Sequence, residues 1–274
     1  MAHRQTAPTT PHGAYESVSN CYTVTVSPSN VLLTTNCNTP QQRDALMGFL
    51  KKFFRNVFHD DTPSPSSSSF DKLSEDELET HLSISRYGNF ELSGGVRPSY
   101  DLDIVPRAGF RHDSYRDEES NTIVPVLMGA VTRPRVMEIF VELIEPLGNV
   151  VDVVLETSHG RGLGHVDLYR EQLDMPILQS ILWDFEDLLV NDGCAGIAVL
   201  NPTIPQEVQL DEHKLLIAYG QDLTPYENVM ADCNVSCHEE IKFITEAEHV
   251  HSTTDQYIEQ FQELKFRLGM DGYR

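Results

Sequence analysis

Basic residues are scarce in this sequence: 20 Lys and Arg stand against 42 Asp and Glu, which leaves a formal net charge of −22 over 274 residues. The excess of acid lies entirely after residue 59, because residues 1–59 carry five basic and only two acidic side chains. An acidic body repels phosphate backbones at long range, so we expect no nucleic-acid binding. The charge instead favours a basic protein partner or divalent cations.

Long apolar runs are also missing. No segment approaches the roughly 18 consecutive apolar residues of a membrane span. The start of the chain, MAHRQTAPTTPHGAYES, lacks the apolar core of a signal peptide. We therefore expect a cytoplasmic protein without a transmembrane segment, while the oligomeric state has no signature in the sequence.

Cysteine is sparse and does not occur in paired patterns. Five scattered cysteines are an odd number, which argues against a disulfide framework and predicts reduced thiols. Cys233, Cys237 and His238 are too few for a structural zinc site, which normally takes four ligands. Cys194 falls within an apolar run and is predicted to be an inert core thiol.

Composition divides the chain into four parts. They are a disordered polar tail (1–18), a β-hairpin with a basic amphipathic helix (19–59), a Ser/Pro-rich linker or exposed loop (60–69) and an acidic α/β body (70–274). The hairpin is predicted from the alternating runs CYTVTVS and VLLTT, which flank a Pro/Ser/Asn turn. The helix follows Thr39-Pro40, a favourable helix start. Whether residues 19–59 form a separate unit is left open by the sequence.

The body alternates strand-like and helix-like segments, which predicts an α/β fold, with α+β as the alternative. We expect a central mixed sheet with helices on its faces. Predicted strands lie at 83–92, 100–105, 123–131, 150–155, 194–200, 214–219 and 241–244. Predicted helices lie at 74–82, opened by a capping box, and at 133–144, 176–190 and 252–268, with a short helix from 224. Residues 108–121 are predicted to be a charged loop.

Two segments of the body have the same predicted order of strands and helices. Residues 123–190 and residues 213–268 both follow a β-α-β-α pattern. At an offset of 90 residues, Glu156 aligns with Glu246 and His159 aligns with His249. The two segments could therefore be an internal duplication.

Acids and histidines gather just past the predicted strands at 150–155 and 241–244. The candidate metal ligands among them are His159, His165, Asp167, Glu246, His249 and His251. In an extended segment His249 and His251 point the same way, because they are two residues apart. If the two strands are neighbours, these side chains meet at one sheet edge and could hold zinc, manganese or iron. The simpler explanation is that strand ends are solvated and collect polar residues.

The loop after the first of these strands is rich in glycine. It reads HGRGLGH, and Gly160, Arg161, Gly162 and Gly164 could bind an anion through backbone amides and the guanidinium group. The loop matches neither the dinucleotide-binding glycine pattern nor the P-loop pattern. A mobile loop is therefore the simpler interpretation.

Two classes of function are consistent with these observations. The first is a non-enzymatic module that binds a basic protein partner, which the acidic body and the lack of a complete catalytic motif favour. The second is a metal-dependent hydrolase with its site at the strand ends near residues 156–167 and 246–251, where a metal-bound water would attack the substrate. We favour the first class on the sequence alone.

Overall fold

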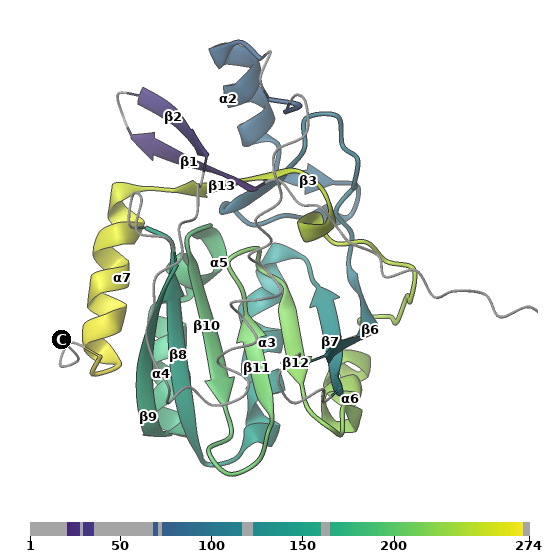
Figure 1. Cartoon of the computed structure of the whole chain (residues 1–274), viewed down its shortest axis with the longest axis vertical. Coiled ribbons are helices and arrows are strands. Elements are labelled where there is room, and N and C mark those ends of the chain that lie inside the picture. Colours follow the sequence, from purple (N-terminus) through teal and green to yellow (C-terminus); the bar gives the residue numbers. More distant parts are fainter. Residues whose placement is uncertain are drawn as a thin grey trace, which may run out of the picture.

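The computed structural model describes residues 21–27, 30–35, 68–70, 73–116, 123–159 and 165–270, the first two segments as backbone only. Within these residues, two sheets dominate the fold (Figure 1). The large sheet contains, in spatial order, β6 (Gly109–Arg116), β7 (Ile123–Ala130), β12 (Leu216–Tyr219), β11 (Glu207–Leu210), β10 (Ala195–Leu200), β8 (Val150–Thr157) and β9 (Val166–Asp174). The small sheet contains β2 (Asn30–Thr35), β1 (Cys21–Ser27), β13 (His249–Thr253) and β5 (Val96–Pro98).

The predicted α/β class is confirmed, but the large sheet is antiparallel rather than mixed. All neighbouring strands described in it pair antiparallel. The reason lies in the connections, because β11 and β12 are joined by the short turn 211–215, whereas a parallel pair needs a long crossover.

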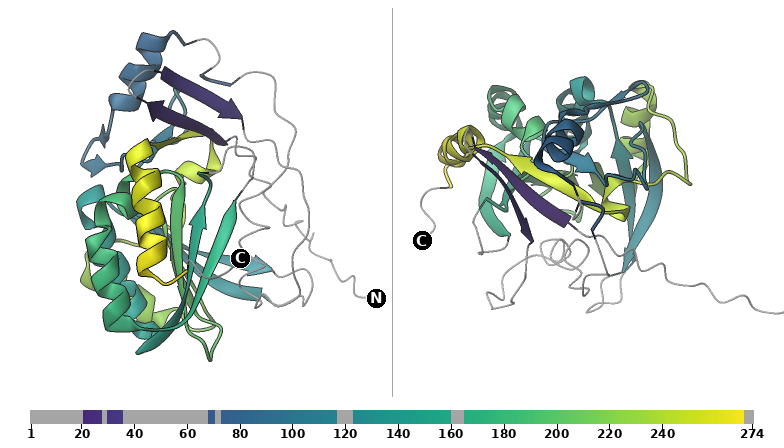
Figure 2. Two further views of the ribbon diagram at one scale, coloured as in Figure 1. Left: turned by 90° about the vertical axis from the view of Figure 1, so that its left-hand side faces the viewer. Right: turned by 90° about the horizontal axis from the view of Figure 1, so that it is seen from above.

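Helices cover one face of the large sheet (Figure 2). They are α3 (Val136–Ile144), α4 (Met175–Asp184), α5 (Glu186–Asn191), α6 (Thr224–Asp232) and α7 (Asp255–Arg267). In α3, the helical spacing buries Ile139, Phe140 and Leu143 completely. Each such side chain contributes roughly 1.5–3 kcal/mol of transfer free energy. Val153 and Leu155 of β8 pack in the same core and Val154 packs on the opposite face, so this stretch of consecutive apolar residues reflects burial on both faces.

A second apolar cluster lies on the opposite face of the large sheet. Residues 241–244, which were expected to form a strand, pack there without one, and a 3-10 helix (Ile244–Glu246) follows. Ile241 and Phe243 are buried in this cluster. The apolar character of this segment therefore reflects burial of Ile241, Phe243 and Ile244 in the cluster rather than pairing in a sheet.

The remaining differences concern short or charged strands. Residues 100–105 form no strand, and the segment 83–92 forms the small ribbon of β3 (Arg86–Tyr87) and β4 (Phe90–Glu91). The expected charged loop at 108–121 contains β6, and β9 has no counterpart among the predicted strands. Both β6 and β9 are edge strands of the large sheet, and edge strands commonly carry charged side chains that hide the apolar alternation.

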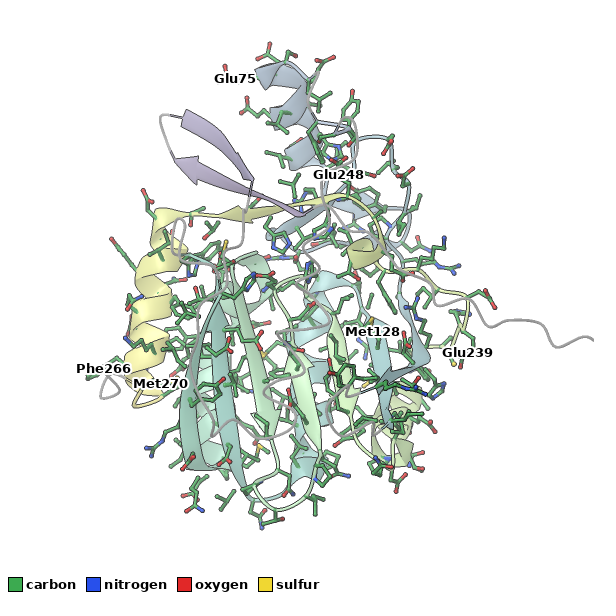
Figure 3. The ribbon with its side chains drawn as sticks, in the orientation of Figure 1. Glu75, Met128, Glu239, Glu248, Phe266 and Met270 are labelled. Atoms are coloured by element: carbon green, nitrogen blue, oxygen red, sulfur yellow. The ribbon has the colours of Figure 1, made fainter. Side chains whose placement is uncertain are left out.

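The small sheet contains the predicted hairpin. β1 and β2 pair antiparallel, and β13 pairs parallel with β1 and antiparallel with β5. Beside this sheet, α2 (Glu75–Ser83) begins with the predicted capping box of Ser74 and Glu77. Its first turn exposes acids such as Glu75 (Figure 3), where the helix dipole favours them. The predicted tail (1–18), the amphipathic helix after Thr39 and most of the 60–69 linker lie outside the described residues.

The turn before β10 holds β13 across the end of the large sheet. The Gly193 amide donates to the Ser252 carbonyl (2.8 Å), and the Ser252 amide donates to the Gly95 carbonyl (2.7 Å). A Cβ atom on Gly193 would lie 2.1 Å from the Gly95 oxygen, so this close approach requires glycine. From this crossing, the chain continues into α7 at the side of the large sheet (Figure 1).

The two segments considered as a repeat differ in topology. In the first segment, β7 and β8 both belong to the large sheet. In the second segment, β12 belongs to the large sheet and β13 to the small sheet. A shared element order therefore does not extend to a shared arrangement, and the fold lends the duplication no support.

Candidate metal centre

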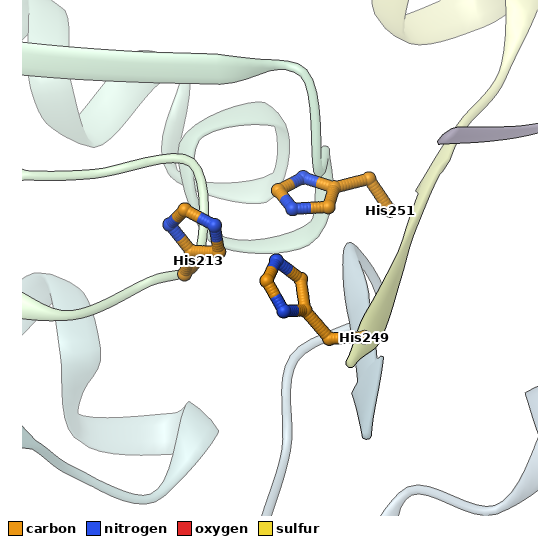
Figure 4. Close-up of side chains that lie close together, drawn as sticks. All are labelled: His213, His249 and His251. Carbon is orange, nitrogen blue, oxygen red and sulfur yellow. The ribbon is translucent and has the colours of Figure 1, made fainter. Parts of the chain in front are cut away.

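Three buried histidines meet where β13 crosses the end of the large sheet (Figure 4). His249 and His251 lie on β13, and His213 lies in the turn between β11 and β12. Alternate residues of a strand share one face, which places both β13 histidines on the side that meets His213. The exposed fractions are 7% for His213 and 1% for each of the other two. We call this set the three-histidine group.

The three rings are in close mutual contact. Their centroids are 4.8 Å apart for His213 and His249, 4.7 Å for His213 and His251, and 5.1 Å for His249 and His251. One ring nitrogen of each points into the space between the rings, and one potential ligand atom from each residue lies within 4.8 Å of the others (Figure 4). Nitrogens bound tetrahedrally to one zinc at about 2.0–2.1 Å lie about 3.4 Å apart, so shifts of about 1 Å would complete a site.

Hydrogen bonds fix the other nitrogen of each ring. The Nδ1 atom of His213 lies 2.7 Å from Asp211 Oδ2, and that of His249 lies 2.8 Å from the Ala247 carbonyl oxygen. The Nδ1 atom of His251 contacts the Gly193 carbonyl oxygen. These oxygens accept, so each Nδ1 donates, and for His249 and His251 this leaves the Nε2 lone pair available in the neutral ring. The Nε2 atoms of His249 and His251 are buried and have no hydrogen-bond partner. Histidine ligands of metals are usually oriented in this way.

The surroundings favour the neutral form of two of the rings. Burial, assisted by the charges of the neighbouring histidines, lowers the pKa of His249 well below its usual 6.5. Burial also lowers the pKa of His251 to about 4, although the charge of Glu212 opposes it. Burial acts in the same direction on His213, but the charge and hydrogen bond of Asp211 outweigh it and raise the pKa. A metal would displace that proton, because imidazole binds metals in its neutral form.

The carboxylate of Glu212 adjoins the three-histidine group. Its Oε2 accepts a hydrogen bond from Ser158 Oγ (3.1 Å), and its Oε1 lies 3.7 Å from Nε2 of His165. Burial alone would raise its pKa, but the charges of His165, His251 and His213 outweigh burial and lower it. Glu212 is therefore ionised at neutral pH.

A second group of potential ligands, His159, Asp192 and Cys194, lies next to the first. His159 Nε2 is 2.7 Å from Asp192 Oδ2, close enough for an ion pair although not aligned as a hydrogen bond. The His159 Nδ1 lies 2.7 Å from Thr157 Oγ1. Cys194 is buried as predicted, and burial raises the pKa of its thiol, which keeps it protonated. Because His159 is already held on both sides, this group is a weaker candidate for a metal.

A third group lies at the surface and comprises His112, Cys237 and Glu239. The ring nitrogens of His112 lie 2.7 Å from Glu239 and 2.8 Å from Glu227. These contacts satisfy the ring without a metal ion.

The six ligands predicted from the sequence have different surroundings. His249 and His251 belong to the three-histidine group, and His159 belongs to the adjacent group. His165 adjoins Glu212. Asp167 accepts a hydrogen bond from the Tyr169 hydroxyl (3.2 Å), and Glu246 forms an ion pair with Arg111 (2.7 Å). The histidines that do come together meet because β13 crosses the end of the large sheet, and not because the two strands are neighbours. The predicted anion cradle of Gly160, Arg161, Gly162 and Gly164 lies outside the described residues.

Sequence reasoning misses His213 and its partner Asp211. The available signal is the run Asp211-Glu212-His213-Lys214, four titratable residues in a turn between apolar segments. Such a turn is normally solvated, but here Asp211 and Lys214 are also buried. A charged turn that is buried is a strong pointer to function, yet its burial cannot be read from the sequence.

Comparison with known proteins adds no constraint on this site. No protein-family model, curated protein or solved structure matches the chain. Among the described residues, no helix has the length and hydropathy required to cross a membrane.

Proposed function

We propose that the protein is a metal-dependent hydrolase whose metal ion is held by His213, His249 and His251. The observation that carries the proposal is the convergence of buried ring nitrogens on one space, with the opposite nitrogens fixed by hydrogen bonds. Leaving a buried polar atom without a partner costs about 1–3 kcal/mol. A metal ion would supply the missing partner for His249 Nε2 and His251 Nε2.

The number of ligands favours catalysis over a purely structural role. Structural zinc sites are closed by four protein ligands, whereas catalytic sites keep one position for water. Among the described residues, no fourth His, Cys, Asp or Glu joins the three-histidine group. Zinc lowers the pKa of a bound water to about 7, which makes hydroxide available at neutral pH. We assign the ionised carboxylate of Glu212, the neighbour of His213 in the chain, as the group that would accept the proton released by this water.

Metal analysis tests the proposal directly. In untagged protein purified without chelator we expect about one zinc, manganese or iron per chain. The double variant His249→Gln, His251→Gln should lose this metal. The matched control is His81→Gln, because His81 is also buried but is not one of the three histidines, and its Nε2 lies 2.9 Å from the Pro98 carbonyl oxygen. Wild-type protein without metal, whose melting temperature does not respond to added divalent ions, would refute the proposal.

Hydrolysis is the second test. Metal-loaded protein should cleave an activated ester such as 4-nitrophenyl acetate, lose this activity on chelation and regain it when the metal is restored. Glu212→Gln should lower the rate about 10²–10⁴-fold, the usual contribution of a general base, while the metal content stays unchanged. Equal rates with and without metal would show that the histidines serve another purpose.

The acidic body supports a second proposal, a cytoplasmic non-enzymatic module that binds a basic protein partner. Its support is the net charge of −22. Capture of a basic polypeptide such as polylysine by metal-free protein, weakened by salt, would favour it. Retained affinity at high salt would argue against a charge-driven partner.

A further inference from the structure

A small pocket opens beside the three-histidine group. His213 lines it, together with apolar side chains that include Leu92, Val136 and Phe243. Its cavity volume is about 30 Å³. A single water needs about 10–15 Å³ on this measure, so the pocket accepts a group of a few heavy atoms rather than an entire large ligand.

The charged side chains of the pocket are all basic. Arg107, Lys242 and Lys214 line it, and no Asp or Glu does, although acids outnumber bases by 42 to 20 in the chain. Lys214 is buried and its ammonium donates to the Ala195 carbonyl (2.7 Å), so it is already engaged. Arg107 and Lys242 are exposed, and neither forms an ion pair with any residue that the structure describes.

A buried hydroxyl provides an independent sign of a ligand. Ser93 also lines the pocket, and its exposed fraction is 3%. Its Oγ atom has no hydrogen-bond partner. A buried hydroxyl without a partner is uncommon, because its desolvation is not compensated. A ligand oxygen in the pocket would accept the hydrogen bond that this hydroxyl can donate.

We infer that this pocket binds a carboxylate or phosphate group of the substrate through Arg107, Lys242 and Ser93, and so presents the rest of the molecule to a metal at His213. The inference rests on the proposed function and specifies its substrate class as a small organic anion. Arginine can contact two oxygens of such a group at once, and lysine adds a point charge.

Calorimetric titration of metal-loaded protein with sodium phosphate and with sodium butyrate tests the inference. We expect at least one of these anions to bind. The double variant Arg107→Gln, Lys242→Gln should bind it at least tenfold more weakly, and Ser93→Ala about 2–10-fold more weakly. The control Arg116→Gln removes one positive charge at the far end of β6 and should leave the affinity unchanged. Tighter binding of butyrate would assign a carboxylate, and tighter binding of phosphate would assign a phosphate.

The metal content of the same samples separates the two proposals. Metal bound by all variants, with anion affinity equal in wild type and the double variant, would overturn the pocket assignment and leave the hydrolase proposal standing. Failure of wild type to bind either anion would overturn it in the same way. Anion binding that depends on Arg107 and Lys242 in protein that never holds a metal would support the pocket and refute the metal-dependent function.

Discussion

Replacing Glu156 by glutamine should stabilise the protein at alkaline pH and change little at acid pH. Glu156 lies on β8, where its Oε2 accepts a hydrogen bond from Gln209 Nε2 (3.0 Å). Burial and then the charges of Asp167, Glu212 and Asp211 raise its pKa from 4.5 to about 8, although the Gln209 hydrogen bond opposes this. The folded protein therefore keeps Glu156 protonated at neutral pH.

The sign and size of the effect follow from proton linkage. Between pH 4.5 and about 8, the unfolded chain releases the Glu156 proton while the folded chain retains it. The free energy of unfolding therefore falls as the pH rises through this window. At about 1.4 kcal/mol per pKa unit, the free energy of unfolding that is lost above this window has an upper bound of about 5 kcal/mol. The side chain keeps partial contact with solvent, which screens the charge, so we expect about 2–3 kcal/mol.

Urea unfolding of chelator-treated protein measures this difference without the charge of a bound metal. At about pH 8.5, Glu156→Gln should exceed wild type by the 2–3 kcal/mol estimated above, and at about pH 4.5 the two should agree within roughly 0.5 kcal/mol. Glu171→Gln, at an exposed position on β9, is the control and should follow the pH dependence of wild type. If Glu156→Gln is no more stable than wild type at the higher pH, Glu156 is not a buried neutral acid and the reasoning fails.

Four further substitutions test the crossing of β13, the metal site and the protein surface. Gly193→Ala places a Cβ 2.1 Å from a backbone oxygen and should cost more than about 3 kcal/mol in urea unfolding. Gly148→Ala, an open position with a φ of 104°, should cost only about 1–2 kcal/mol, and similar costs would contradict the close approach at the crossing. Asp211→Asn should weaken zinc binding about 10–100-fold in competition with a chromophoric chelator, whereas unchanged affinity would show that the carboxylate does not support the site. His112 has a raised pKa, chiefly through its hydrogen bond to Glu239, so it stabilises the fold below pH 6.5 and loses that contribution as the pH rises. Thermal melts of His112→Gln should therefore show a loss below about 1 kcal/mol at acid pH that disappears by about pH 9, and a loss independent of pH would count against the ion pairs.

The elements that the sequence predicts well are those whose pattern is set by a single dominant environment. α3 shows helical spacing because one of its faces packs on the large sheet, and residues 153–155 of β8 are consecutive apolar residues because both faces of the strand are covered there. The edge strands β6 and β9 are harder to predict from the sequence, because their charged side chains give them the composition of a loop. Residues 241–244 resemble a strand because three of their four side chains are apolar and buried, although the segment has no strand pairing.

The sequence by itself determined that the body is α/β, that Cys194 is a buried thiol, and that His249 and His251 share one face of an extended segment. Each of these properties depends on neighbours along the chain, so a local pattern can reveal it. Only the tertiary structure decided that the third histidine of the group is His213. That choice depends on β13, a strand of the small sheet, crossing the end of the large sheet, where the Gly193 amide donates a hydrogen bond to the Ser252 carbonyl. Close approach between segments far apart in the chain is set by packing, which no local pattern contains.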